Sequence, residues 1–149
     1  MESAPRDDDR HKTPELEELS RAECLSLLSA QSVGRIAVIA GDGLPFVAPV
    51  NYELLGDTIV FRTNAGTKLE ALQRHPVAFQ IDSIDPGHRA GWSVLVQGVA
   101  HEAAPHELTS VIVEPWLGPK QYWIQVVPRY ISGRRIRLPD IAFDARAYT

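Results

Sequence analysis

Short strand-like segments follow one another along this chain, with connections too short to hold a crossover helix. They are rich in β-branched and aromatic residues and occupy residues 34–40, 45–52, 58–63, 77–82, 92–100 and 122–127, the last continuing past a kink at Pro128. Because parallel neighbours need long crossovers, antiparallel pairing must dominate. The sequence therefore predicts a mainly β fold, a small barrel of about six antiparallel strands with two or three helices at its rim.

Turn and helix signals separate these strands. A hairpin signal at residues 41–43 joins the first two, and Pro49 places the second at an edge or a bulge because proline lacks a ladder donor. Ser20 and Glu23 form a capping box for a helix that should end near residue 32. Residues 68–74 read as a short helix ended by Pro76.

The rest of the chain completes one expected domain. Pro105 can open a third helix that ends near residue 114. Residues 15–137 should form the domain, with a loosely docked tail at 1–14 and an irregular tail at 138–149. The acidic residues between 15 and 18 read as a solvated face.

Composition excludes several classes of function. The 149-residue chain has 44% hydrophobic residues, no apolar run of membrane-spanning length and a polar start that does not resemble a secretory signal. A net charge of −4 argues against nucleic-acid binding, and the five histidines show no metal-ligand spacing. Cys24, the single cysteine, reads as a small buried hydrophobe. We therefore expect a cytoplasmic protein with no membrane segment, nucleic-acid partner or metal.

The segment at residues 58–72 carries the most chemistry. A strand delivers Arg62 and Thr63, a three-residue loop follows, and Thr67 stands at the expected N-cap of the short helix, directly before Lys68. A guanidinium, two hydroxyls, an ammonium and the N–H groups of a helix start are donors that a phosphate group needs. The segment therefore indicates a phosphate site.

These residues alone leave a plainer interpretation open. Any strand-loop-helix junction can carry a cap, and arginine and lysine are usually solvated. The segment matches neither the Walker loop nor the dinucleotide-binding glycine pattern.

The order and spacing of several short motifs narrow the choice. The motifs are Gly34-Arg35, Pro49-Val50-Asn51-Tyr52, Phe61-Arg62-Thr63 with Gly66-Thr67-Lys68-Leu69, Gly91-Trp92-Ser93-Val94 through Gly98, and Ser132-Gly133-Arg134-Arg135. Together they resemble the pyridoxamine 5′-phosphate oxidase-like flavoproteins with the FMN-binding split-barrel fold, and most closely the short actinobacterial-type branch. The resemblance covers about residues 20–137.

The resemblance implies a homodimer with two cofactor sites at its interface. In such proteins the segment matching Arg62, Thr63, Thr67 and Lys68 holds the flavin phosphate. The segment that matches Pro49, Val50 and Asn51 runs along the isoalloxazine edge. The segment that matches Trp92, Ser93 and Val94 approaches the cofactor from the neighbouring subunit. Trp116, Arg134 and Arg135 are weaker candidates for the pocket rim.

The function that the resemblance implies is that of an oxidoreductase, which passes hydride or electrons between FMN, or a deazaflavin, and a small conjugated substrate. No side chain is assigned as an essential acid or base. The basic and aromatic residues with which the longer oxidase grips pyridoxal phosphate have no counterpart that can be placed here, so vitamin B6 oxidation is not expected. A non-catalytic carrier or sensor of flavin or deazaflavin and a heme-binding split barrel remain alternatives.

Overall fold

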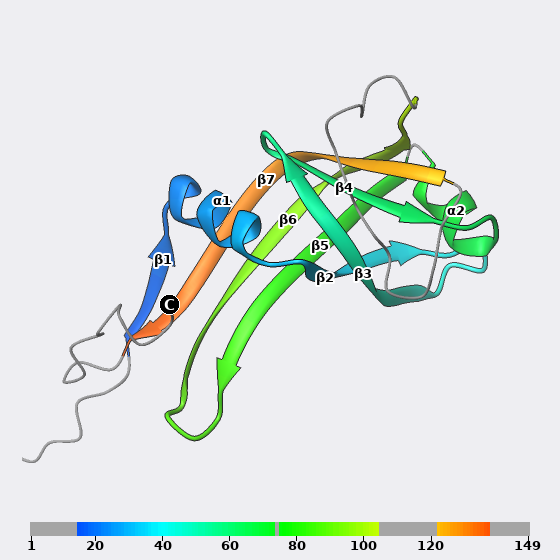
Figure 1. The fold of residues 1–149 in the computed structure, drawn as a ribbon. Coiled ribbons are helices and arrows are strands. Elements are labelled where there is room, and N and C mark those ends of the chain that lie inside the picture. The colour runs from blue at the N-terminus through cyan, green and yellow to red at the C-terminus, as the bar shows by residue number, and fades with distance from the viewer. Residues whose placement is uncertain (1–14, 74, 105–121, 138–149) are drawn as a thin grey trace, which may run out of the picture.

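The computed structural model describes residues 15–73, 75–104 and 122–137 (Figure 1). The strands are β1 (Glu15–Leu19), β2 (Val33–Ile39), β3 (Pro45–Leu55), β4 (Thr58–Thr63), β5 (His75–Asp85), β6 (Ala90–Glu102) and β7 (Tyr122–Arg137), and the helices are α1 (Arg21–Ala30) and α2 (Thr67–Leu72). The expected third helix, the two tails, Arg74 and Trp116 lie outside the described residues.

Six of the strands close a barrel. The order is β7-β4-β3-β2-β5-β6, and β6 pairs back onto β7, which closes the ring of strands. Every pairing is antiparallel, as the short connections require. The predicted mainly β barrel is therefore confirmed.

The long strand β7 closes the ring by pairing with β4 along its first part and with β6 along most of its length. Its ladder with β6 shifts register: Gln97 faces Tyr130 whereas Gly98 faces Pro128, which leaves Arg129 as an extra residue. This is a β-bulge, which bends the strand and increases its twist. In place of the kink predicted at Pro128, β7 therefore has a bulge at the next residue, Arg129.

The core fills the barrel interior with alternate residues of each strand. On β5 these are Val77, Phe79 and Ile81, all buried, as the sequence pattern predicted. Tyr52 packs edge-on against Phe79, with ring centroids 4.7 Å apart. The other fully buried large side chains are Leu28, Ile36, Ile59, Val60, Phe61, Leu72, Val94, Val96, Ile124 and Val126.

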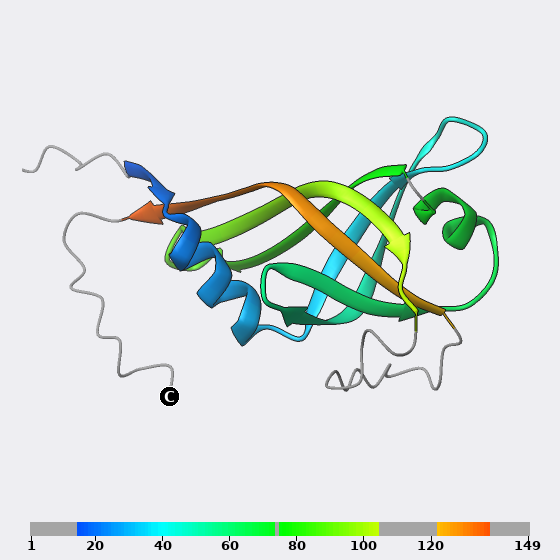
Figure 2. The ribbon, with the colours of Figure 1, turned by 90° about the horizontal axis from the view of Figure 1, so that it is seen from above.

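The two helices lie at opposite ends of the barrel (Figure 2). The capping box of Ser20 and Glu23 is present as predicted, and α1 ends at Ala30 rather than near residue 32. The buried hydroxyl of Tyr52 donates a hydrogen bond of 2.5 Å to the carbonyl of Leu28, one of the carbonyls that a helix end leaves unpaired. Burial raises the pKa of Tyr52, which keeps the phenol a donor.

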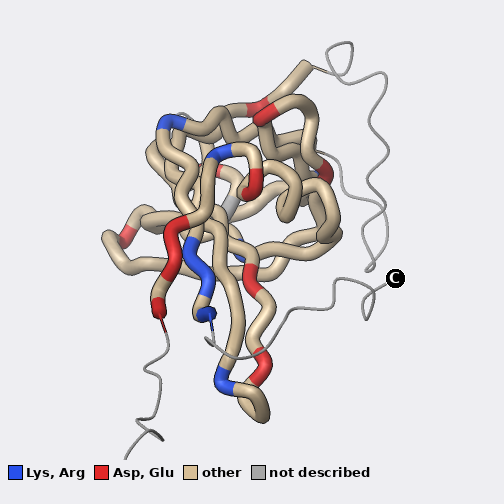
Figure 3. The backbone as a smooth tube through the Cα atoms, turned by 90° about the vertical axis from the view of Figure 1, so that its left-hand side faces the viewer, with Lys and Arg blue, Asp and Glu red and all other residues tan. Residues whose placement is uncertain are grey.

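Glu15 and Glu18 are exposed and Glu17 is half-buried, which agrees with a largely solvated face, but the sequence analysis did not predict that these residues form a strand. β1 pairs with the far end of β7, where Glu17 faces Arg135 and Glu18 faces Arg134 (Figure 3). Opposite charges on facing residues stabilise such a pair of strands. The local sequence gave no indication of this strand because the arginines that face its acidic residues lie far along the sequence.

The short helix also differs from its prediction. It spans Thr67–Leu72 and ends before Pro76, which already belongs to β5. Leu69, Ala71 and Leu72 are buried in the core, so the helix covers one end of the barrel. Among the described helices, none combines the length and hydrophobicity that crossing a membrane requires.

Gly98 should be the glycine least tolerant of a side chain. A Cβ there would lie 2.1 Å from the Val127 carbonyl oxygen, and backbone cannot swing away as a flexible side chain can. We expect Gly98→Ala to lower the free energy of unfolding by about 1–3 kcal/mol or more, measured by urea denaturation. Gly41→Ala is the matched control, because its Cβ would meet nothing within 4 Å. Equal stability of the two variants would contradict the assigned bulge packing.

Candidate functional site

The corner between β4 and α2 places Arg62 on the outside of the barrel. Phe61 and Thr63, its neighbours on β4, are buried on the inner face, whereas Arg62 is half-buried on the outer face. A loop of three residues then leads into α2. Gly66 caps that helix at φ 146°, a backbone conformation that favours glycine.

The prediction that Thr67 is the N-cap is therefore wrong. Thr67 is the first helical residue, and no side chain caps the helix. The glycine conformation at residue 66 turns the chain one position earlier than the cap preference of threonine indicated. Thr67 and Lys68 thus open α2, and their side chains lie outside the description.

Arg62 is stacked on an aromatic ring. Its guanidinium carbon lies 4.8 Å from the centroid of Trp123, the residue that faces it on β7. Trp123 in turn packs against Val60 and Ala103, a small buried cluster separate from the main core. This cation–π contact restrains the position of the guanidinium.

Thr63 plays a structural part in this corner. It is 5% exposed, and its hydroxyl donates to the carbonyl of Asn64 at 3.4 Å. Its side chain therefore faces the barrel interior while Arg62 faces outward.

The segment Pro49–Asn51 lies on β3 beside this corner. Between residues 45 and 50 the ladders of β3 join it to β2 alone, so Pro49 lies at a local edge, as its missing donor predicted. Val50 is buried in the core, and Asn51 is half-buried. The β3–β4 ladder stops at Tyr52 and Phe61, and the next residues outward are Asn51 and Arg62. The structure thus brings Asn51 and Arg62 to the same end of this ladder.

The third predicted segment lies elsewhere. Trp92 and Ser93 are half-buried near the start of β6, and Val94 is fully buried in the core. Trp92 faces Arg135 at the far end of β7, whereas Arg62 faces Trp123 near its start. Residues 123 and 135 are separated by roughly 40 Å of strand. One chain therefore does not bring all the predicted site residues together.

The two arginines considered for the pocket rim lie opposite acidic residues of β1. Arg134 faces Glu18 on β1 and Ser93 on β6. Arg135 forms an ion pair with Glu23 of α1, with 3.7 Å between Nη1 and Oε2. Both lie at the β1 end of the barrel, far along β7 from Arg62.

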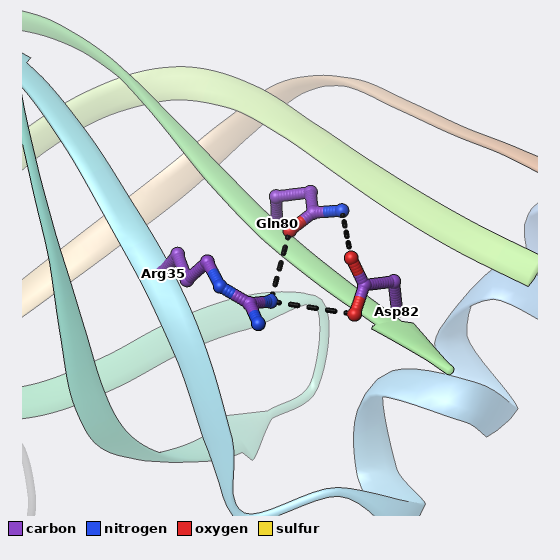
Figure 4. Close-up of polar contacts among 3 residues, drawn as sticks. All are labelled: Arg35, Gln80 and Asp82. Carbon is purple, nitrogen blue, oxygen red and sulfur yellow. Dashed lines mark hydrogen bonds and ion pairs between the residues drawn. The ribbon is translucent and has the colours of Figure 1, made fainter. Parts of the chain in front are cut away.

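A polar network that the sequence analysis missed lies on the outer face of β2 and β5 (Figure 4). Arg35 donates to Gln80 at 3.3 Å and to Asp82 at 3.4 Å, and the Gln80 amide donates to Asp82 at 2.9 Å. Arg35 faces Gln80 across the ladder. Gln80 and Asp82 alternate with the buried residues of β5, a pattern that could have marked them as one outward row.

The described residues offer no nucleophile or metal cluster. No group of three His, Cys, Asp or Glu side chains within them could hold a metal ion. Cys24 is fully buried, and burial raises the pKa of its thiol, which leaves little reactive thiolate. The exposed pair of His88 and Asp85 sits in the β5–β6 turn, where hydrogen bonds from His88 lower the pKa of Asp85.

A family model and a curated relative each match most of this chain. The model of the pyridoxamine 5′-phosphate oxidase family matches residues 20–135. An uncharacterized protein of Mycobacterium tuberculosis, Rv0080, is 30% identical over 132 residues, which cover 82% of this chain and 86% of that protein.

Two solved structures extend the comparison. The FAD-binding protein of Mycobacterium smegmatis is 34% identical with a TM-score of 0.68, covering 81% of this chain and 98% of its own. An FAD-binding protein of Mesorhizobium loti is 25% identical with a TM-score of 0.68, covering 85% of this chain and all of its own.

Proposed function

This chain belongs to the pyridoxamine 5′-phosphate oxidase family, in its flavin-binding split-barrel group, and on that premise we propose that it is a flavin-dependent oxidoreductase. It would pass hydride or electrons between a bound flavin and a small conjugated substrate. The flavin supplies the redox chemistry, and the protein binds and orients it.

The corner between β4 and α2 carries this proposal. Arg62 is half-buried on the outer face with its guanidinium over the ring of Trp123, and Lys68 follows at the start of α2. A fork of donors and a second cation suit the phosphate of a flavin nucleotide. α2 has six residues, so its dipole contributes little and the two cations must supply most of the attraction.

The edge of β3 suits the ring of the flavin. Pro49 and Asn51 lie next to the end of the β3–β4 ladder, where Arg62 also lies, and residues 45–50 of β3 pair with β2 alone. Backbone groups there can fix the polar edge of a flat ring while apolar residues flank its face.

The flavin nucleotide is proposed as FMN, with FAD and a deazaflavin as the other forms. FMN is what the family resemblance implies, whereas the two solved relatives are FAD-binding proteins. All three cofactors present a phosphate group and a tricyclic ring, so the corner suits each. Identification of the extracted cofactor by mass spectrometry distinguishes them.

We further propose that two copies complete each site. Trp92 and Ser93 lie at the opposite end of β7 from Arg62, so they can approach the flavin only from a second subunit. The outer face of β6 and β7 offers apolar surface: Val99 and Val127 are more than 40% exposed, and Tyr130 is 64% exposed. The Arg35 network borders this face and supplies both signs of charge for a two-fold contact.

Purified protein should take up one flavin nucleotide per chain. We expect yellow protein or saturable quenching of added FMN or FAD fluorescence, and reduction of the bound flavin by NAD(P)H or a substrate without oxygen. No uptake of either nucleotide would contradict the proposal, and a heme spectrum would favour the heme-binding alternative. A bound flavin that no reductant or substrate reaches would favour a carrier or sensor.

Lys68→Ala should weaken flavin binding by about 1–3 kcal/mol, the range of a charge-assisted hydrogen bond. Isothermal titration with the nucleotide that wild type binds more tightly measures the change. Arg21→Ala is the control, because it also removes one positive charge but lies on α1, at the other end of the barrel. Equal affinities of the two variants would remove Lys68 from the site.

The protein should sediment as a dimer at micromolar concentration, at twice the 16.5 kDa of one chain. Leu95→Asp should shift the equilibrium to monomers, because Leu95 points outward from the middle of β6. Leu55→Asp is the control, since this exposed leucine lies at the β3–β4 turn. Wild-type monomers alone would contradict the proposed shared site.

A further inference from the structure

Besides its strand pairing with β4, Trp123 has a further backbone hydrogen bond and packs against buried side chains. Its carbonyl accepts a hydrogen bond of 2.9 Å from the Ala103 amide, and its ring packs against Val60 and Ala103. Val60 and Ala103 are 0% and 4% exposed, although Val60 lies on the outer face of β4. A ring packed on buried neighbours and anchored through its backbone has little freedom to move.

Arg62 gains its orientation from that ring. The two residues face each other on neighbouring strands, and the guanidinium lies 4.8 Å from the ring centroid. This contact restrains the guanidinium, whose planar fork of N–H donors suits a bidentate phosphate contact. An unrestrained arginine must lose side-chain entropy when it binds, and a stacked one has already lost much of it.

We infer that Trp123 is a positioning residue, which orients Arg62 for the phosphate of the flavin nucleotide. The inference rests on the proposed flavin site and adds to it a residue that touches no ligand. The small cluster of Val60, Ala103 and Trp123 lies outside the barrel core. Its function, on this inference, is to hold the Trp123 ring in the position that orients Arg62.

A double-mutant cycle tests this inference with four proteins: wild type, Trp123→Leu, Arg62→Gln and the double variant. The affinity for FMN or FAD, whichever wild type binds more tightly, is measured by fluorescence titration. We expect Trp123→Leu to weaken binding about five- to tenfold in the presence of Arg62. In the Arg62→Gln background the same substitution should change affinity less than twofold.

Two further measurements separate positioning from a general packing role. Trp123→Phe should recover most of the affinity, since it keeps an aromatic face for Arg62. Riboflavin, which lacks the phosphate, should bind wild type and Trp123→Leu equally. Equal losses with and without Arg62, or an equal loss for riboflavin, would overturn the positioning role while leaving the flavin proposal intact. A wild type that binds neither nucleotide would overturn both.

Discussion

The pairing of β7 with three other strands is the constraint on which the rest of the structure depends. β7 closes the barrel against β4 and β6 and carries β1 at its far end. A strand of 16 residues can serve all three only because the bulge beside Gly98 bends it around the barrel. Glycine is needed there because the carbonyl of Val127 occupies the space of a Cβ.

The same strand also distributes the functional residues. Near its start, Trp123 faces Arg62, and near its end Arg135 faces Trp92. The two ends lie far apart along β7, so one chain alone does not bring the two groups of predicted site residues together. A two-fold arrangement of chains would bring the start of one β7 toward the end of the other, which is the physical basis of the proposed dimer.

The sequence predicted most of the barrel because its information is local. Alternation in β5, the hairpin at residues 41–43 and the capping box at Ser20 each lie within a few neighbouring residues. The features it missed are paired at long range. β1 is recognisable only beside the arginines of β7, and the Arg35 network needs β2 and β5 side by side.

The candidate site divides in the same way. Arg62 and Pro49 could be chosen from sequence because their residue types and spacing carry chemistry. Trp123 could not, since its pairing with Arg62 spans 61 positions of the chain. Thr67 was misplaced by one residue because the conformation of Gly66, rather than a side-chain cap, begins α2. The burial of Val60 on the outer face of β4 likewise could not be predicted from the residues next to it in the sequence.

The most direct measurement is a crystal structure of the protein with FMN or FAD at saturation. The phosphate nearest the ring should lie against the guanidinium of Arg62 at the corner between β4 and α2, with the tricycle along Pro49–Asn51. A flavin bound elsewhere, with Arg62 facing solvent, would contradict the assignment of this corner as the phosphate site.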